Sequence, residues 1–93
     1  MRITEKMIEQ KVNVLNSITN SPETTYTKDD NGNLKANIGN FHLGIESGFY
    51  NINRVTNEGG GIIVEVSGQN KRELFNKLVS YINGLRLGLE LEI

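Results

Sequence analysis

The hydrophobic period of this chain changes twice, and this change restricts the possible folds more than any other feature. Between residues 4 and 19, apolar side chains recur at the three- and four-residue spacing of an amphipathic helix. Between residues 24 and 68, short segments alternate apolar and polar residues, as half-buried strands do. Residues 70–83 return to the helical spacing. Helices and strands segregated in this way indicate an α+β domain, with helices on one face of an antiparallel sheet.

Both predicted helices carry signals at their ends. Thr4 is placed to cap the first helix, and Pro22 disfavours helical geometry at the residue before it. Asn70, followed three residues later by Glu73, resembles a capping box for the second helix. Gly84 is expected to end that helix, because glycine is the usual residue just after a helix C-terminus.

Turn residues divide the central region into four or five strands, joined as an antiparallel meander. Asn31-Gly32 is the strongest signal, because this dipeptide suits a two-residue hairpin turn. Gly39, Gly48 and the glycine run at 59–61 mark further turns. The alternation predicts inward-facing apolar side chains at Leu34, Ala36, Ile38, Phe41, Leu43, Ile45, Tyr50, Ile52, Ile62, Val64 and Val66.

Residues 85–93 alternate leucine or isoleucine strictly with arginine, glycine or glutamate. This two-residue period predicts a C-terminal strand rather than an extension of the second helix. A strand with one wholly aliphatic face must be covered by the domain's own sheet or by a second subunit, because an exposed edge of this kind promotes aggregation. The segment therefore favours a homo-oligomer.

Length and composition exclude several classes of protein. Residues 1–93 are expected to form a single domain, because a chain of this length buries one modest core. The absence of cysteine excludes disulfides, thiolate catalysis and cysteine-ligated zinc. The net charge of −1 provides no general positive field for nucleic acid. No apolar run approaches the roughly 20 residues of a membrane helix, and a charged N-terminus is unlike a signal peptide. A cytoplasmic protein without membrane association is expected.

No spacing of residues in the sequence selects a catalytic or metal-binding set. His42 is the one histidine, and nothing places a nucleophile and an orienting carboxylate beside it. Asp29 and Asp30 belong to a hairpin turn, where aspartate bonds to local backbone, and the downstream glutamate of a calcium loop is missing at the required spacing. We therefore expect a protein that is not an enzyme and carries no metal or cofactor.

The glycine run allows two interpretations. It is a flexible hairpin turn, or a backbone cradle for an anion, since consecutive amides without side chains approach a ligand closely. Arg54 is expected on the same face as Tyr50 and Ile52, so it needs a partner. That partner is either Glu58 or a phosphate or carboxylate of a ligand. The first candidate contacts for an anionic ligand are therefore Arg54, Asn57, Gly59, Gly60 and Gly61.

Lys71 and Arg72 form a second candidate set. They lie in the first turn of the predicted second helix, where the helix dipole favours acids over cations. They are either solvated charges offset by Glu73 or, together with the helix N–H groups, an anion site. His42 and Tyr26 complete the candidates, and Tyr26 would stack on a nucleotide-like ligand if it is more than an exposed sheet residue.

Four segments together resemble a family of small, largely uncharacterised bacteriophage proteins over most of residues 3–84. They are KMIEQKVNVLNSITNSPE (6–23), YTKDDNGNLKANIGNFHL (26–43), NEGGG (57–61) and KRELFN (71–76). The resemblance implies a phage origin and action in the host cytoplasm. Small α+β phage proteins include sponges that sequester nucleotide signals of host defence. By this analogy the expected ligand is a small anion, such as a cyclic nucleotide or an ADP-ribose derivative. The last residues, RLGLELEI, depart from the family pattern.

Two alternatives stay open. The order helix, three strands, helix, with Lys71 and Arg72 at the start of the last helix, is similar to a double-stranded RNA-binding domain. The chain could also block a host protein through an interface alone, using the polar face with Asn51 and Asn53 or an edge strand.

Overall fold

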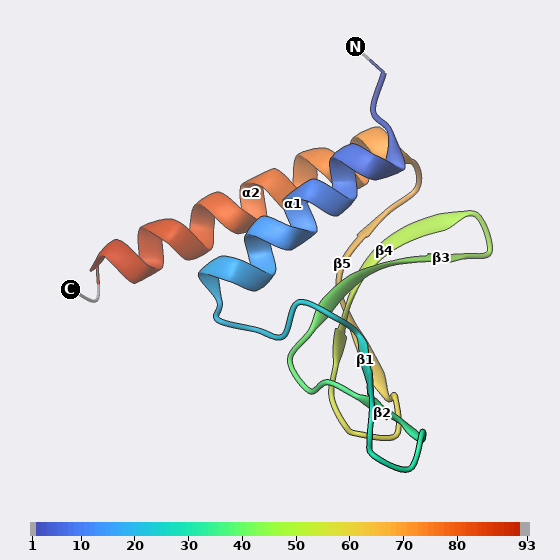
Figure 1. Cartoon of the computed structure of the whole chain (residues 1–93). Coiled ribbons are helices and arrows are strands. Elements are labelled where there is room, and N and C mark those ends of the chain that lie inside the picture. The colour runs from blue at the N-terminus through green and yellow to red at the C-terminus, as the bar shows by residue number, and fades with distance from the viewer. Residues whose placement is uncertain (1, 92–93) are drawn as a thin grey trace.

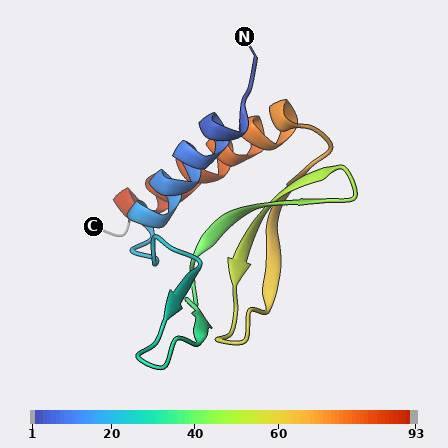
Figure 2. The same cartoon turned by 45° about the vertical axis from the view of Figure 1, so that its right-hand side comes forward.

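The computed structural model describes residues 2–91 and confirms the α+β class. Both helices lie on one face of a three-stranded antiparallel sheet, and a small β-hairpin extends from one end of that sheet (Figures 1 and 2). The elements in chain order are α1 (Glu5–Ile18), β1 (Tyr26–Lys28), β2 (Leu34–Ala36), β3 (Phe41–Glu46), β4 (Phe49–Val55), β5 (Ile62–Gly68) and α2 (Lys71–Leu91).

The five strands form two sheets instead of one continuous meander. β3, β4 and β5 pair in that order, whereas β1 and β2 pair only with each other. The Ala36 N–H donates to the carbonyl of Glu58 at 3.0 Å, which attaches the small hairpin to the turn between β4 and β5. Gly32 and Gly48, in the tight turns, both have a φ of 82°, a conformation that glycine adopts without a steric penalty.

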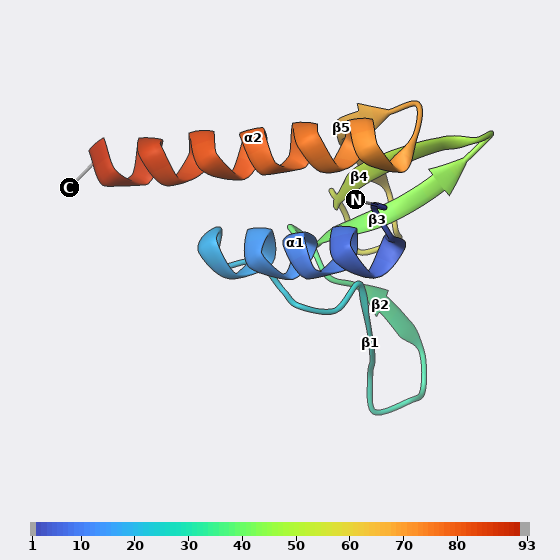
Figure 3. The ribbon, with the colours of Figure 1, turned by 90° about the horizontal axis from the view of Figure 1, so that it is seen from above.

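The core lies between the two helices and the sheet. Figure 3 shows α1 and α2 side by side and running in the same direction, with α1 on the β3 side and α2 on the β5 side. Because the apolar residues of each helix recur every three or four positions, they form one buried stripe that packs on the sheet. The central residues of this core are Ile8, Val12, Leu15, Phe41, Ile52, Val66, Leu74, Leu78 and Ile82.

Both predicted helix caps are confirmed. The hydroxyl oxygen of Thr4 accepts a hydrogen bond from the Met7 N–H at 3.2 Å. The carboxamide oxygen of Asn70 accepts from the Glu73 N–H at 2.9 Å. These bonds satisfy N–H groups that have no acceptor within the first turn of a helix. Neither α1 nor α2, within residues 2–91, is both long enough and apolar enough to cross a membrane.

The prediction of a C-terminal strand is wrong for the described residues. α2 continues through Gly84, which is not a stop, and ends at Leu91; residues 92–93 lie outside the described part. Leucine, arginine and glutamate favour a helix, and the segment 85–91 contains no β-branched residue. A helix that is already nucleated adds one hydrogen bond for each residue. Among residues 2–91 no strand lies beside the end of α2, which projects beyond the end of α1 (Figures 1 and 3).

The predicted inward positions are correct at Ala36, Phe41, Ile52 and Val66 and wrong at five others. Leu34 is 65% exposed and Ile38 is also exposed, because no helix covers the β1–β2 hairpin. Ile45 is exposed near the far end of β3. In β5, Ile62 and Val64 are exposed because the strand contains a β-bulge between them and Val66. An extra residue reverses the faces on which the side chains before it lie.

The sheet face opposite the helices buries two asparagines. Asn51 accepts a hydrogen bond from the Ser67 hydroxyl at 2.8 Å through its carboxamide oxygen. Asn53 lies beside Gly44, where a Cβ atom would overlap the Asn53 amide nitrogen. A glycine in β3 therefore makes room for a polar side chain of β4.

Candidate functional site

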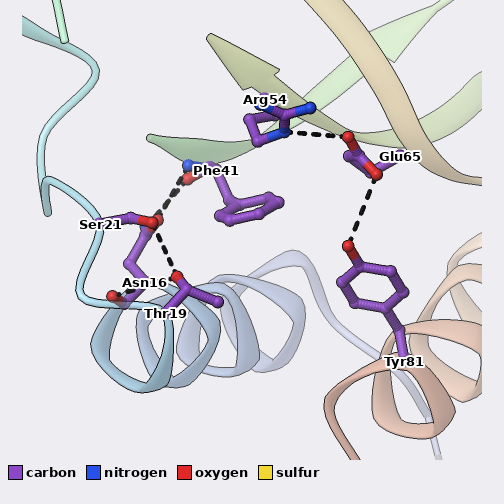
Figure 4. Close-up of polar contacts among 7 residues, drawn as sticks. All are labelled: Asn16, Thr19, Ser21, Phe41, Arg54, Glu65 and Tyr81. Carbon is purple, nitrogen blue, oxygen red and sulfur yellow. Dashed lines mark hydrogen bonds and ion pairs between the residues drawn. The ribbon is translucent and has the colours of Figure 1, made fainter. Parts of the chain in front are cut away.

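The partner of Arg54 is Glu65, and the prediction of Glu58 is wrong. The Arg54 Nε donates to the Glu65 Oε1 at 2.9 Å (Figure 4). Glu58 instead pairs with Lys35 at 3.1 Å on the surface. The β5 bulge explains the difference. Val64 and Val66 pair with adjacent residues of β4, so Glu65 is the extra residue, and its side chain lies on the helix side beside Arg54.

Glu65 also connects the sheet to α2. The Tyr81 hydroxyl donates to Glu65 Oε2 at 3.5 Å (Figure 4). Burial, the negative charge of Glu65 and this hydrogen bond together raise the pKa of Tyr81, and the charge of Arg54 opposes them. The phenol therefore stays protonated and remains a donor at neutral pH. Arg54 belongs to an interaction that attaches α2 to the sheet, and its charge is already balanced by Glu65.

The glycine run forms the predicted hairpin connection between β4 and β5. The Gly60 N–H donates to the Asn57 carbonyl at 3.1 Å, and the Gly61 N–H donates to the Asn57 carboxamide oxygen at 3.0 Å. Gly60 has a φ of 97°, which favours glycine. A Cβ at Gly60 would lie 3.7 Å from the Tyr26 hydroxyl, so the small hairpin approaches this turn. Two of the three amides expected to form a cradle donate within the turn itself.

His42 lies at the other side of the sheet, on β3. Its Nδ1 is 3.3 Å from the carboxamide oxygen of Asn40. Burial lowers the pKa of His42, so the imidazole is neutral at neutral pH. Within residues 2–91, no group of three or more histidine, aspartate or glutamate side chains is arranged to hold a metal ion.

Lys71 and Arg72 lie in a hollow of about 460 Å³ that is open to solvent, the α2 hollow. Its walls come from three places in the chain: the segment before α1, strand β4 and the first turn of α2 (Figure 1 shows the starts of both helices close together). The lining residues are Arg2, Ile3, Tyr50, Asn70, Lys71 and Arg72.

The α2 hollow is positively charged. Arg2, Lys71 and Arg72 line it, and none of its described lining residues carries a carboxylate. Glu73, the acid in the first turn of α2, pairs with Lys77 one turn further along at 3.0 Å. The N-terminus of α2 adds the positive end of its helix dipole. An anion in this hollow is therefore favoured by the cations of the segment before α1 and of the first turn of α2, and by the backbone N–H groups of that turn.

The structure thus places Lys71 and Arg72, the second predicted set, beside Arg2 and Tyr50, for which the sequence carries no comparable signal. Arg2 lies two residues before the Thr4 cap, and Tyr50 was expected in the core. The parallel arrangement of the two helices brings the segment before α1 to the start of α2 (Figure 3). Tyr50 reaches the same place because β4 pairs with β5, with Tyr50 opposite Gly68 just before α2. Arg54, the glycine run, His42 and Tyr26 are not among the residues that line the α2 hollow.

Comparison of the chain with protein-family models, with curated proteins and with solved structures finds no match.

Proposed function

We propose that this protein binds a small anionic, nucleotide-type ligand without catalysis, and that the α2 hollow is the site. The observation that carries the proposal is the convergence of Arg2, Lys71 and Arg72 on the N-terminus of α2, with no carboxylate in the described lining. Backbone N–H groups at a helix N-terminus and nearby cations are the usual combination for binding phosphate. Tyr50 adds an aromatic side chain to the same hollow, on which a base can stack.

The size of the α2 hollow supports a small ligand. Its volume of about 460 Å³ falls within the roughly 300–1,000 Å³ of typical ligand sites. Arg54, the first candidate from the sequence, supports this role less well because Glu65 already neutralises its charge. The resemblance to small phage proteins supports the finer proposal, in which the ligand is a nucleotide signal of host defence and binding sequesters it in the host cytoplasm.

The proposal is tested by thermal unfolding in the presence of cyclic nucleotides, cyclic dinucleotides and ADP-ribose derivatives. A ligand at 100 times its Kd adds about 2.7 kcal/mol to the free energy of unfolding, which raises the Tm by many degrees in a domain of this size. We expect Arg2→Ala and Lys71→Ala each to weaken binding about tenfold, because each removes a charge-assisted contact. Lys28→Ala, on the distant small hairpin, is the matched control and should bind normally. A panel in which no ligand raises the Tm contradicts the proposal.

A second candidate function is binding of double-stranded RNA. The observation that favours it is the packing of α1 and α2 in parallel on one face of a three-stranded sheet, with Lys71 and Arg72 at the start of α2 (Figure 3). This arrangement is similar to a double-stranded RNA-binding domain, whose contacts are made mostly to phosphates and 2′-hydroxyls. Retention of duplex RNA that falls steeply with added salt would favour this function over small-ligand binding.

A further inference from the structure

Strand β3 is an edge of the larger sheet, and its outward backbone groups can be identified. Within the described chain β3 pairs only with β4, and the register is continuous from Phe41 to Glu46. In an antiparallel pair, consecutive residues point their N–H and C=O groups alternately toward and away from the partner strand. Both groups of Phe41 bond to the side chain of Asn16, so they point away from β4. By the same alternation, the groups of Leu43 and Ile45 also point to the edge.

Asn16 occupies this edge at one position only. Its carboxamide oxygen accepts from the Phe41 N–H at 2.8 Å, and its Nδ2 donates to the Phe41 carbonyl at 3.0 Å (Figure 4). These are the two bonds that a neighbouring strand would make. Among residues 2–91, no such partner engages the outward groups of Leu43 or Ile45. The edge is therefore capped at its start and open at the next two outward positions.

A second hollow, of about 290 Å³, lies between this edge and α1, and we call it the β3-edge hollow. Its charged side chains are the carboxylates of Glu9 and Glu23, and no lysine or arginine of the described residues lines it. Neither carboxylate forms an ion pair within residues 2–91. His42 also lines the hollow and is neutral, because burial lowers its pKa. The β3-edge hollow is therefore negative, in contrast to the α2 hollow.

We propose that the β3 edge binds an extended peptide segment of a partner protein, and that this segment carries a lysine or arginine. The segment would pair with the outward N–H and C=O groups of Leu43 and Ile45 as an added strand. Since side chains alternate along a strand, one basic side chain would enter the β3-edge hollow between Glu9 and Glu23. The unpaired N–H and C=O groups of Leu43 and Ile45 favour a peptide backbone as the ligand. The carboxylates of Glu9 and Glu23 favour a basic side chain on that peptide. The site shares no residue with the α2 hollow, so it stands or fails independently of the ligand proposed there.

The test uses the full chain and a short capped peptide of alternating valine and lysine. Two matched peptides serve as controls: one has glutamate in place of lysine, and the other has N-methylated backbone amides that cannot pair. Nuclear magnetic resonance follows the amides of the protein. We expect the lysine peptide to bind and to slow hydrogen exchange at the Leu43 and Ile45 N–H groups at least about tenfold, while neither control peptide does so.

Protein variants test separately the recognition of the basic side chain by the carboxylates and the pairing of the peptide backbone with β3. The double variant Glu9→Gln with Glu23→Gln should weaken binding about tenfold, because the basic side chain loses its charge partners. Asp30→Asn, in the exposed β1–β2 turn, is the matched control and should bind normally. Ile45→Pro removes an outward N–H that does not pair with β4, so it should abolish binding of the lysine peptide. If this variant does not fold, the N-methylated peptide tests the same backbone pairing.

Several results would overturn the proposal. One is the absence of binding of the lysine peptide at about 1 mM, because a Kd above this concentration is too weak for a specific site. A second is equal binding of the glutamate peptide, and a third is a set of resonance changes confined to residues away from β3. Slow exchange at Leu43 and Ile45 without peptide, increasing with protein concentration, would show that a second copy of this chain occupies the edge instead.

Discussion

Arg54 shows how a single inserted residue decides what a side chain does. Its face on β4 follows from simple alternation and was predicted correctly. Its partner depends on Glu65, the extra residue of the β5 bulge, which lies on the helix side of the sheet. Without the bulge, the alternation of β5 would place Glu65 on the opposite face. Arg54 would then be an unbalanced cation beside the core.

The pair between Arg54 and Glu65 should contribute measurably to stability. We expect Glu65→Gln to lower the free energy of unfolding by about 1–2 kcal/mol, because Arg54 loses its charge partner at a half-buried position. Glu58→Gln breaks the pair with Lys35, in which both side chains are more than half exposed, and should change stability by less than about 0.5 kcal/mol. Urea unfolding of both variants checks this difference. Equal losses in the two variants would contradict the role assigned to Glu65.

His42 should make the stability of the protein depend on pH. Its ordinary pKa is 6.5, and burial lowers that value in the folded state. As the pH falls below 6.5, the unfolded chain binds a proton before the folded chain does, so stability decreases toward acid pH. The variant His42→Gln should lose this contribution between pH 7 and the lowered pKa. Urea midpoints measured across this range test the sign, and a wild-type midpoint no more sensitive to pH than that of the variant would contradict it.

At the scale of elements, α2 is the main difference between expectation and structure. The leucines of residues 85–91 alternate as in a strand, yet Leu85 and Leu89 also stand four residues apart, as neighbours on a helix do. The pattern is therefore compatible with both structures. The decision comes from the turns of α2 that precede this segment, which already form a helix on the sheet, and from helix-favouring residues that continue it.

Alanine substitutions test the helical state of this segment. No heavy atom outside the helix lies within 4 Å of a Cβ built at Gly84 or Gly88, so a methyl group fits at both positions. We expect Gly84→Ala and Gly88→Ala each to stabilise the protein by up to about 1 kcal/mol and to increase the helical signal in circular dichroism. Gly68→Ala, whose Cβ would overlap Leu74, is the contrasting control and should destabilise it. Loss of helical signal in the Gly88 variant would indicate that this segment is not a helix.

At the scale of the whole molecule, the two helices define two chemically opposite hollows. Their parallel arrangement brings the segment before α1 to the start of α2, which gathers the cations of the α2 hollow. The other side of α1 faces the edge of β3 and contributes Glu9 to the negative hollow. A protein that binds a small anion at one hollow and a basic peptide at the other would use both sides of the same helix layer.

The homo-oligomer expected from the sequence stays a prediction, and the exposed leucines near the end of α2 are the place to test it. In the last turns of α2, Leu87 is 58% exposed and Leu89 is 45% exposed. We expect light scattering to give a mass above the 10.4 kDa of one chain, and the double variant Leu87→Gln with Leu89→Gln to reduce it to that of a monomer. Leu34→Gln, which changes a still more exposed leucine of the small hairpin, is the control and should keep the wild-type mass. An unchanged mass in the double variant would place any association elsewhere.

By itself the sequence determined the α+β class, both helix caps, the turn positions and the faces of β3 and β4 near the helices. These features depend on residues a few positions apart, whose periodicity and capping bonds are local. Only the tertiary structure decided the helical end of α2, the pairing of Arg54 with Glu65 and the meeting of Arg2 and Tyr50 with Lys71. The last two depend on contacts between distant segments, which a bulge, a strand pair or a parallel helix pair changes without altering the local pattern. The helical end of α2 depends on the earlier turns of α2, whose packing on the sheet nucleates a helix that residues 85–91 continue.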